Sequence, residues 1–281
     1  MTDYLQRAKF FRAKKRLGQN FLINPDVISD IIKFAKITKE DTVLEVGAGV
    51  GFVTEQLVEY AGKVIALELD EDAIKELQKI KCDNLEIVHA DILKTDISAL
   101  SESNLKIVAN IPYYITSPII AHLLGEIDDL ENKNRNKTDE IILMVQEEVA
   151  RRITATEKSP SKQYGLLTIL SQFWADCEIV RLVGRKSFYP APKVNSALVY
   201  FKVRKEPLLK TDDYGFFRRV VKAAFSQRRK TLKNCLLVGG FEKDTVINAI
   251  SSLGLEENTR GEKLSIQQFG MLAEELRNSA G

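Results

Sequence analysis

Residues 110–116 have the types and spacing needed to hold an amino group and to stack against the ring that carries it. Asn110, Pro112 and Tyr113 come directly after residues 105–109, an apolar run typical of a buried strand. The N6 nitrogen of adenine is a poor nucleophile because its lone pair is delocalised into the ring. The Asn110 side-chain oxygen and the Pro112 carbonyl can each accept a hydrogen bond from one N–H group of the amine, which favours a pyramidal nitrogen. Tyr113 can stack on the base. The alternative is a strand end followed by a proline turn, because short motifs also occur by chance.

A glycine-rich turn, residues 47–51, lies between a predicted strand at residues 42–46 and a predicted helix at residues 52–60. Glycines allow a sharp turn and a close approach to a ligand, and the N-terminus of a helix follows. The spacing Gly-x-Gly-x-Gly differs from the dinucleotide fingerprint, which has two residues before its third glycine, and Glu45 precedes the turn. The pattern therefore favours a nucleoside without a pyrophosphate over NAD.

Acidic residues follow two more predicted strands. Glu68 ends the strand at residues 63–67, about 20 residues beyond the glycines, where a carboxylate in such folds accepts from ribose hydroxyls. Asp91 and Ile92 end the next strand, in a position to contact an adenine edge. Each acidic residue by itself is more often a helix cap or a solvated turn. Together with the glycines and Asn110 they indicate S-adenosylmethionine (SAM), because parallel sheets bind ligands at their carboxyl ends.

The elements that must position these residues alternate along the chain, which predicts a parallel, doubly wound sheet. A helix should begin at Asn24-Pro25, and five strands are expected at residues 42–46, 63–67, 85–90, 105–109 and 140–145. Residues 163–175 predict a helix, and residues 178–183 and 197–203 predict the closing strands of the sheet. The polar residues 128–139 predict a surface loop. After Pro207 the pattern is helical, with Phe216, Val220, Ala223 and Ala224 on one face, and predicts a small all-α domain.

Five motifs occur in the order found in one known family. They are residues 18–22, the glycine turn at 47–51, residues 110–116, the Phe-Tyr-Pro-Ala-Pro-Lys-Val segment at 188–194, and residues 225–231. From Arg16 almost to its C-terminus, the chain resembles the KsgA/RsmA-type rRNA adenine N6,N6-dimethyltransferases. The resemblance implies an α/β fold: a Rossmann-like class I SAM-dependent methyltransferase sheet with a small C-terminal all-α domain.

The resemblance also implies roles for individual residues. Asn110, Pro112 and Tyr113 would hold the target adenine, and Phe188 would close its other face. Without the family pattern, the Phe-x-Pro-x-Pro segment would be explained equally well as a rigid connector, because prolines fix extended backbone. The implied cofactor contacts are Asn20, Leu22, Gly47, Gly49, Glu68, Asp91, Ile92 and Asn110.

Basic residues concentrate in two segments. Residues 1–20 carry a net charge of +5 and residues 214–234 carry +7, whereas the whole chain carries +2, so the rest must carry −10. Charge runs are usually solvated faces, but two of them flanking an acidic catalytic half suggest a footprint for RNA phosphates. The predicted RNA-binding residues are Arg12, Lys14, Lys15, Arg16, Arg218, Arg219, Lys222, Arg228, Arg229, Lys230 and Lys233.

The length of 281 residues with 44% apolar residues predicts a large core and two domains, a catalytic domain at residues 1–205 and a helical RNA-binding domain at 206–281. No apolar run reaches the ~20 residues of a membrane helix, and the N-terminus lacks the features of a signal peptide. Cys82, Cys177 and Cys235 are expected to be buried thiols in a reducing cytoplasm, and no metal site is expected. A cytoplasmic monomer is predicted.

The activity implied by the resemblance is dimethylation of N6 on two adjacent adenosines in the 3′-terminal hairpin loop of small-subunit rRNA, within the immature subunit. Three alternatives remain at this point. An Erm-type enzyme acting on large-subunit rRNA shares the Asn110 and Phe188 motifs, and a DNA adenine methyltransferase would use similar amine chemistry. A ribosome-assembly factor could keep the pocket but act only by binding.

Overall fold

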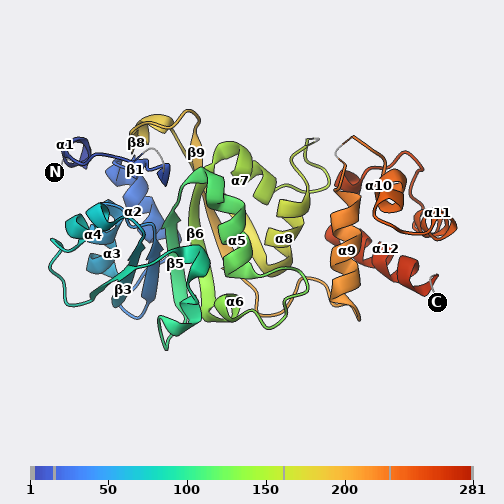
Figure 1. Ribbon diagram of the computed structural model, residues 1–281, viewed down its shortest axis with the longest axis horizontal. Helices are drawn as coiled ribbons and strands as arrows, with labels where there is room; N and C mark the ends of the chain where they lie inside the picture. Colours follow the sequence, from blue (N-terminus) through green and yellow to red (C-terminus); the bar gives the residue numbers. More distant parts are fainter. Residues whose placement is uncertain (1–3, 15–16, 161, 228, 280–281) are drawn as a thin grey trace. The chain divides into compact units, whose positions relative to one another are not determined.

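Seven strands form one mixed sheet in the order β4-β3-β2-β5-β6-β9-β7 (Figure 1). The computed structural model describes residues 4–14, 17–160, 162–227 and 229–279. The strands of this sheet are β2 Thr42–Val46, β3 Lys63–Glu68, β4 Leu85–His89, β5 Leu105–Asn110, β6 Thr138–Gln146, β7 Ala175–Val183 and β9 Ser196–Val203. The predicted α/β class and strand positions are confirmed, within one to three residues at each end.

The order of the strands reverses at β2, because β2 pairs in parallel with both β3 and β5. Open α/β sheets bind ligands at such a switch point, beyond the carboxyl ends of the strands. The register sets Val46 opposite Ala109, so that Gly47 and Asn110 leave their strands at the same level. Two motifs that lie 63 positions apart in the sequence are thereby brought to one edge of the sheet.

Helices connect the strands of this sheet, as the alternation predicts. The helix α2 begins where expected: Asn24 caps it by accepting from the Asp26 backbone N–H, and Pro25 occupies the first turn. Its apolar stripe is buried, with Val27, Ile28 and Ile31 at most 2% exposed. The helices are α2 Pro25–Phe34, α3 Phe52–Tyr60, α4 Glu71–Leu77, α5 Thr116–Leu124, α6 Lys133–Lys137 and α7 Glu147–Ile153.

The N-terminal segment returns to the Phe-x-Pro-x-Pro segment through a second, two-stranded sheet. Strand β1 (Phe21–Leu22) pairs antiparallel with β8 (Phe188–Tyr189), which sets Leu22 opposite Phe188. Helix α1 (Tyr4–Phe10) lies beside this pair, as Figure 1 shows. The Arg7 guanidinium donates to both carboxylate oxygens of Glu55 at 2.9 and 2.6 Å. The segment before β1 is therefore attached to α3 as well.

A second compact unit consists mainly of helices. It comprises α8 Leu166–Trp174, α9 Tyr214–Ala224, α10 Leu232–Val238, α11 Lys243–Ser252 and α12 Ile266–Asn278 (Figure 1). Its core is aromatic: Phe173, Phe217 and Phe269 are fully buried, and the rings of Phe173 and Phe217 lie 5.6 Å apart. None of the helices in the part of the chain described here combines the length and apolarity needed to cross a membrane.

The helical unit is not continuous along the chain. Residues 126–130 and 151–175 group with the helices that follow residue 205, whereas residues 131–150 and 176–205 group with the sheet unit. Helix α8 explains this, because Phe173 packs on Phe217 of α9 and the Phe173 carbonyl accepts from Leu208 N–H at 3.0 Å. Aromatic contacts, and not chain order, determine which unit α8 joins.

The predicted surface loop at residues 128–139 is wrong in its second half, which forms α6. Asn132 caps this helix by accepting from Arg135 N–H at 2.8 Å, and the Arg135 side chain is completely buried. Arg135 Nη1 donates to the Leu124 carbonyl at 2.9 Å. The polar composition is misleading here because these side chains satisfy backbone carbonyls inside the unit, where water is excluded.

Two smaller expectations are also wrong. The buried aromatic residue of α9 is Phe217, whereas Phe216 is only half-buried, because the helical stripe is rotated by one residue. Cys82 is exposed and Cys177 is only partly buried, although Cys235 is buried as expected. Neither difference affects the edge of the sheet where the candidate site lies.

Candidate functional site

A cavity lies beyond the carboxyl ends of β2, β3 and β5, lined by the glycine turn, the ends of these strands and residues 17–22 of the N-terminal segment. Every residue predicted to contact a cofactor lines it, as do Pro112 and Tyr113. The structure therefore brings together four sequence motifs at one edge of the sheet. The predicted residues at the cavity wall are Asn20, Leu22, Gly47, Gly49, Glu68, Asp91, Ile92, Asn110, Pro112 and Tyr113.

The glycine turn requires glycine at Gly49. This residue has a φ of +57°, which disfavours L side chains, and an added Cβ would lie 3.1 Å from the Phe21 ring. The Gly49 backbone N–H donates to Glu68 Oε2 at 2.7 Å. The turn is thus held against the end of β3 with its backbone exposed to the cavity.

Glu68 organises the turns on both sides of it. Its Oε1 accepts from the N–H groups of Leu69 and Asp70 at 2.8 Å, while Oε2 accepts from Gly49. The residue is 7% exposed and lines the cavity. Glu68 therefore ties the glycine turn to the end of β3 and places its carboxyl group at the cavity wall, where a hydroxyl-rich ligand would meet it.

Glu45 is a second buried carboxyl group in the cavity wall, 3% exposed. The pKa of Glu45 is raised to about 8, chiefly by burial. The Thr54 hydroxyl, which donates to Glu45 Oε2 at 2.5 Å, opposes this shift, and the nearby charge of Glu68 contributes to it. The sequence analysis used Glu45 only as evidence against a pyrophosphate site. Thr54, which lies on α3, has no signature in the sequence.

The pKa of Glu45 predicts a pH dependence of stability. Between the ordinary carboxyl pKa of about 4.3 and the folded value of about 8, the native state keeps a proton that the unfolded chain releases, so rising pH favours unfolding. We expect Glu45→Gln to remove this dependence. In urea denaturation, the wild type should lose on the order of 2 kcal/mol relative to Glu45→Gln between pH 5.5 and 7.5. Parallel stability curves for the two proteins would contradict the assignment.

The Asn110 side-chain nitrogen makes a hydrogen bond, whereas its side-chain oxygen is available to a ligand. Its Nδ2 donates to the Asn20 carbonyl at 3.2 Å, and its Oδ1 has no hydrogen-bond partner within the described part of the chain. The Pro112 carbonyl accepts from Ile115 N–H at 3.1 Å, which uses one of its two lone pairs. Two oxygens, one on each residue, therefore retain the capacity to accept from an amino group.

Tyr113 presents a half-buried ring at the cavity. Its hydroxyl shares a hydrogen bond of 2.7 Å with the Ser196 hydroxyl on β9, and Ser196 is fully buried. Burial raises the pKa of Tyr113, against the opposing effect of Ser196, so the phenol stays protonated near neutral pH. The predicted motif at residues 188–194 ends two positions before Ser196, but sequence reasoning missed this residue.

The N-terminal segment is fastened over the cavity by contacts that sequence analysis also missed. The Lys14 ammonium pairs with Asp70 and, at 2.7 Å, with Asp72. The Gln19 side-chain amide donates to Asp70 at 2.8 Å and its oxygen accepts from Lys14 N–H at 2.8 Å. Asp70 is 3% exposed. Lys14, predicted to bind RNA, is thus engaged by acidic side chains at the start of α4.

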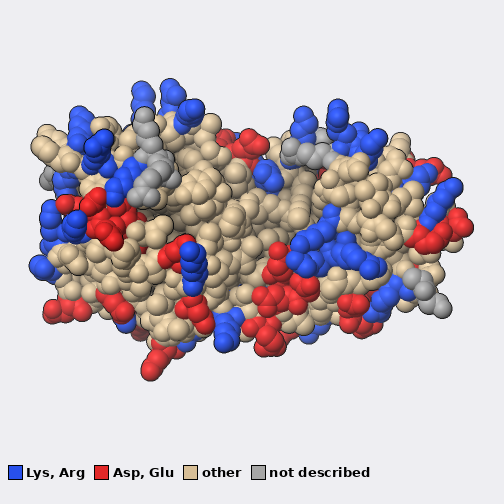
Figure 2. Space-filling view, viewed as in Figure 1, with Lys and Arg blue, Asp and Glu red and all other residues tan. Residues whose placement is uncertain are grey.

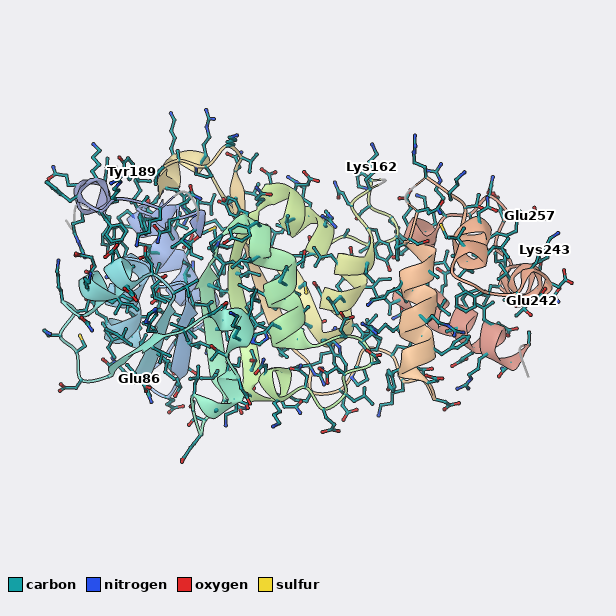
Figure 3. The ribbon with its side chains drawn as sticks, in the orientation of Figure 1. Glu86, Lys162, Tyr189, Glu242, Lys243 and Glu257 are labelled. Atoms are coloured by element: carbon teal, nitrogen blue, oxygen red, sulfur yellow. The ribbon has the colours of Figure 1, made fainter. Side chains whose placement is uncertain are left out.

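Phe188 lies in different surroundings from those expected. Phe188 is 2% exposed and packs in the hydrophobic core with Phe21 and Leu22, and its side chain is not at the cavity wall. The neighbouring Tyr189, labelled in Figure 3, is half-buried. Asp91 lines the cavity and also caps the short 3₁₀ turn η2 (Ile92–Lys94) by accepting from Leu93 N–H at 3.1 Å.

Most predicted RNA-binding cations of the helical unit have partners within it. Arg218 pairs with Glu126 at 2.9 Å, and Figure 2 shows basic side chains beside acidic ones over α9. Lys222 reaches Glu126 at 3.6 Å, and Lys233 pairs with Glu257 at 3.0 Å (labelled in Figure 3). The Arg219 guanidinium lies 4.8 Å and 5.0 Å from the centroids of the Phe216 and Phe241 rings.

Three cations of the predicted set, Arg12, Arg229 and Lys230, are exposed and make no ion pair with any residue that the structure describes. The predicted residues Lys15, Arg16 and Arg228 lie outside the described residues. The exposed, unpaired cations are the ones best able to exchange water for phosphate, because they give up no internal contact.

Comparison with known proteins identifies a family that shares this arrangement. The model of the family described as "Ribosomal RNA adenine dimethylase" matches residues 10–278. A "Ribosomal RNA small subunit methyltransferase A" of Clostridium botulinum (strain Loch Maree / Type A3) is 41% identical over 268 residues, which cover 94% of each chain. A protein of the same name from Listeria innocua serovar 6a is 41% identical over 286 residues, covering 97% of this chain and 93% of that one.

Solved structures with the same fold include a dimethyladenosine transferase from Plasmodium falciparum. It superposes with a TM-score of 0.76 at 27% identity, and covers 92% of this chain and 97% of that one. The 23S rRNA methyltransferase ErmE superposes with a TM-score of 0.67 at 26% identity, and covers 92% of this chain and all of that one. Both similarities extend over the sheet unit and the helical unit.

Proposed function

The chain belongs to the ribosomal RNA adenine dimethylase family, and we propose that it dimethylates N6 of two adjacent adenosines in the 3′-terminal hairpin loop of small-subunit rRNA. It is a SAM-dependent rRNA adenine dimethyltransferase of the small subunit. We further propose that it acts as a cytoplasmic monomer on the immature subunit. In this proposal the sheet unit is catalytic, and the helical unit binds RNA through exposed cations such as Arg229 and Lys230.

One observation carries the proposal: Asn110, whose side-chain oxygen is available, and Pro112 line the same cavity as the glycine turn and Glu68. The chemistry of this wall fits SAM. A glycine backbone admits the ligand closely, the carboxyl oxygens of Glu68 can accept from ribose hydroxyls, and Asp91 can accept from an adenine amine. The residues proposed to hold SAM are Asn20, Leu22, Gly47, Gly49, Glu68, Asp91, Ile92 and Asn110.

When bound, SAM supplies an electrophilic methyl group. The proposed task of Asn110 and Pro112 is to accept hydrogen bonds from the two N6–H groups of the target adenine, which favours a pyramidal nitrogen and frees its lone pair from the ring. The base must first leave its stack at a cost of a few kcal/mol, and stacking on Tyr113 offsets this by about 1 to 3 kcal/mol. Alignment of nitrogen and methyl group should supply the largest part of the rate, since orientation can remove about 7 to 11 kcal/mol of barrier.

The buried position of Phe188 affects its proposed contact with the target base. Phe188 is 2% exposed and belongs to the same hydrophobic cluster as Phe21 and Leu22, so its ring would have to become exposed to close the second face of the base. Tyr113 alone suffices for the stacking contribution given above.

Transfer of label from radiolabelled SAM tests the function. We expect undermethylated small subunits to accept label, and the modified positions to be two adjacent adenosines of the 3′-terminal loop. Large subunits and DNA serve as parallel substrates. Label confined to large subunits would support the Erm-type alternative, and tight RNA binding without any label would support a non-catalytic assembly factor.

The Erm-type alternative has weaker support. The two curated relatives described above, at 41% identity, are named as small-subunit enzymes, whereas ErmE is 26% identical to this chain. ErmE also superposes less closely than the dimethyladenosine transferase, with TM-scores of 0.67 and 0.76. The small-subunit substrate is therefore the one proposed.

A further inference from the structure

We propose that Ser196 is a positioning residue for the target base, because its hydroxyl holds the Tyr113 ring in the orientation that stacking requires. This inference rests on the proposed function, since it assigns Tyr113 to the base. It extends that function to a residue on β9, 83 positions away from Tyr113 in the sequence.

The register of the sheet explains why Ser196 reaches Tyr113. Asn110 lies opposite Met144 on β6, and Gln146 of β6 lies opposite Ser196 on β9. Ser196 is therefore two residues further toward the cavity edge than Asn110, at the level that the chain reaches at Pro112. The first residue of β9 thus stands beside the turn that carries Tyr113.

The backbone on either side of Ser196 is fixed, because the following residue, Ala197, pairs with Val145 of β6 and the preceding residue is held by hydrogen bonds. The carbonyl of the preceding residue, Asn195, accepts from Glu147 N–H at 3.0 Å, and the Asn195 side chain accepts from Arg185 N–H at 3.3 Å. The Ser196 side chain is fully buried and its hydroxyl bonds to the Tyr113 phenol at 2.7 Å. A rigid strand end therefore restrains the free end of the aromatic ring.

The hydrogen bond between Ser196 and Tyr113 gives a reason for tyrosine, and not phenylalanine, at position 113. A tyrosine that only stacked on a base would not need its hydroxyl, and Phe would serve equally well. A ring attached at Cβ alone can rotate about χ1 and χ2, so a second attachment at the hydroxyl reduces the freedom that is lost when the base arrives. The phenol stays protonated near neutral pH and can keep the bond.

A double-mutant cycle with Tyr113→Phe tests the proposal. We expect Ser196→Ala to lower kcat/KM for the RNA substrate ~3- to 10-fold, the change that one hydrogen bond of ordinary strength produces, while the KM for SAM stays unchanged. In the Tyr113→Phe background, Ser196→Ala should change kcat/KM less than about 1.5-fold, because the bond is already absent. Equal effects in both backgrounds would overturn the proposal.

Ser187→Ala is the matched control. Ser187 is also buried, and its hydroxyl accepts from the Asn24 amide at 3.2 Å instead of reaching Tyr113. We expect this variant to lose stability like Ser196→Ala but to keep the kcat/KM for RNA. A similar loss of kcat/KM in Ser187→Ala would show that loss of any buried hydroxyl bond has this effect, and would reject the specific role.

The result of the double-mutant cycle does not depend on which RNA is the natural substrate. It is measured on whichever RNA the wild type methylates, so that label in an unexpected RNA rejects only the proposed substrate. A hairpin with 2-aminopurine at the target position provides a readout that needs no methyl transfer, since its fluorescence reports unstacking and restacking of the base. No label and no fluorescence change with the wild type would reject both the proposed function and the role of Ser196.

Discussion

Asn110→Ala is expected to lower kcat for methyl transfer by roughly 10²- to 10³-fold while the chain still folds and binds SAM. The estimate follows from removal of one preorganised hydrogen-bonding group at the reacting centre of an enzyme. Alanine also removes the Nδ2 bond to the Asn20 carbonyl, so SAM affinity should fall by no more than a few fold. Single-turnover transfer with saturating SAM separates the two effects.

Asn104→Ala is the matched control for this experiment. Asn104 immediately precedes β5, at the opposite end of the strand from Asn110, and its amide donates to Asp139 at 3.0 Å on the surface. Its loss should leave kcat unchanged. Asn110→Asp keeps an acceptor oxygen and should fall between the wild type and Asn110→Ala. Full activity of Asn110→Ala would reject the acceptor role.

Glu68→Ala should weaken cofactor binding by at least ~100-fold. Without the carboxylate, the N–H groups of Gly49, Leu69 and Asp70 lose their acceptor, and each buried donor left unpaired costs about 1–3 kcal/mol. The glycine turn would no longer be held at the end of β3, and the proposed ribose contact would also be lost. Calorimetric titration with S-adenosylhomocysteine measures the affinity without turnover.

Glu86→Ala provides the comparison for Glu68→Ala. Glu86 lies on the adjacent strand β4, pairs with Lys63 at 2.8 Å, and is half exposed (labelled in Figure 3). Exposed pairs of this kind contribute about 0–1 kcal/mol, so ligand affinity should stay within twofold of the wild type. If Glu68→Ala binds S-adenosylhomocysteine like the wild type, Glu68 does not hold the cofactor site together.

The structural link between these two experiments is the switch point of the sheet. Because β2 pairs with both β3 and β5, the glycine turn lies between Glu68 and Asn110. The Asn110 side chain donates a hydrogen bond to the Asn20 carbonyl. The residue before Asn20, Gln19, donates a hydrogen bond from its side-chain amide to Asp70. The proposed cofactor and base sites therefore share one hydrogen-bonded framework.

The predicted strand and helix positions that the structure confirms depend on interactions between residues close together in the sequence. Apolar runs of five or six residues bounded by turns predict β2, β3 and β5, and Asn24-Pro25 predicts the start of α2, because caps and turns act within a few residues. Strand alternation with helices requires a parallel sheet, which in turn gathers the strand ends at one edge. The residues at the cavity wall follow from that rule without any knowledge of side-chain contacts.

Contacts between distant parts of the chain were decided by the tertiary structure alone. The bond between Ser196 and Tyr113 depends on the register of β6 with β9, and the burial of Phe188 depends on its pairing with Leu22. The pairing of Lys14 with Asp70 and the burial of Arg135 likewise require partners that no local pattern specifies. The sequence by itself determined which residues could do the chemistry and at which edge they meet. Which side chains restrain them was set by packing and strand register, because a hydrogen bond depends on distances between atoms that only the folded chain brings together.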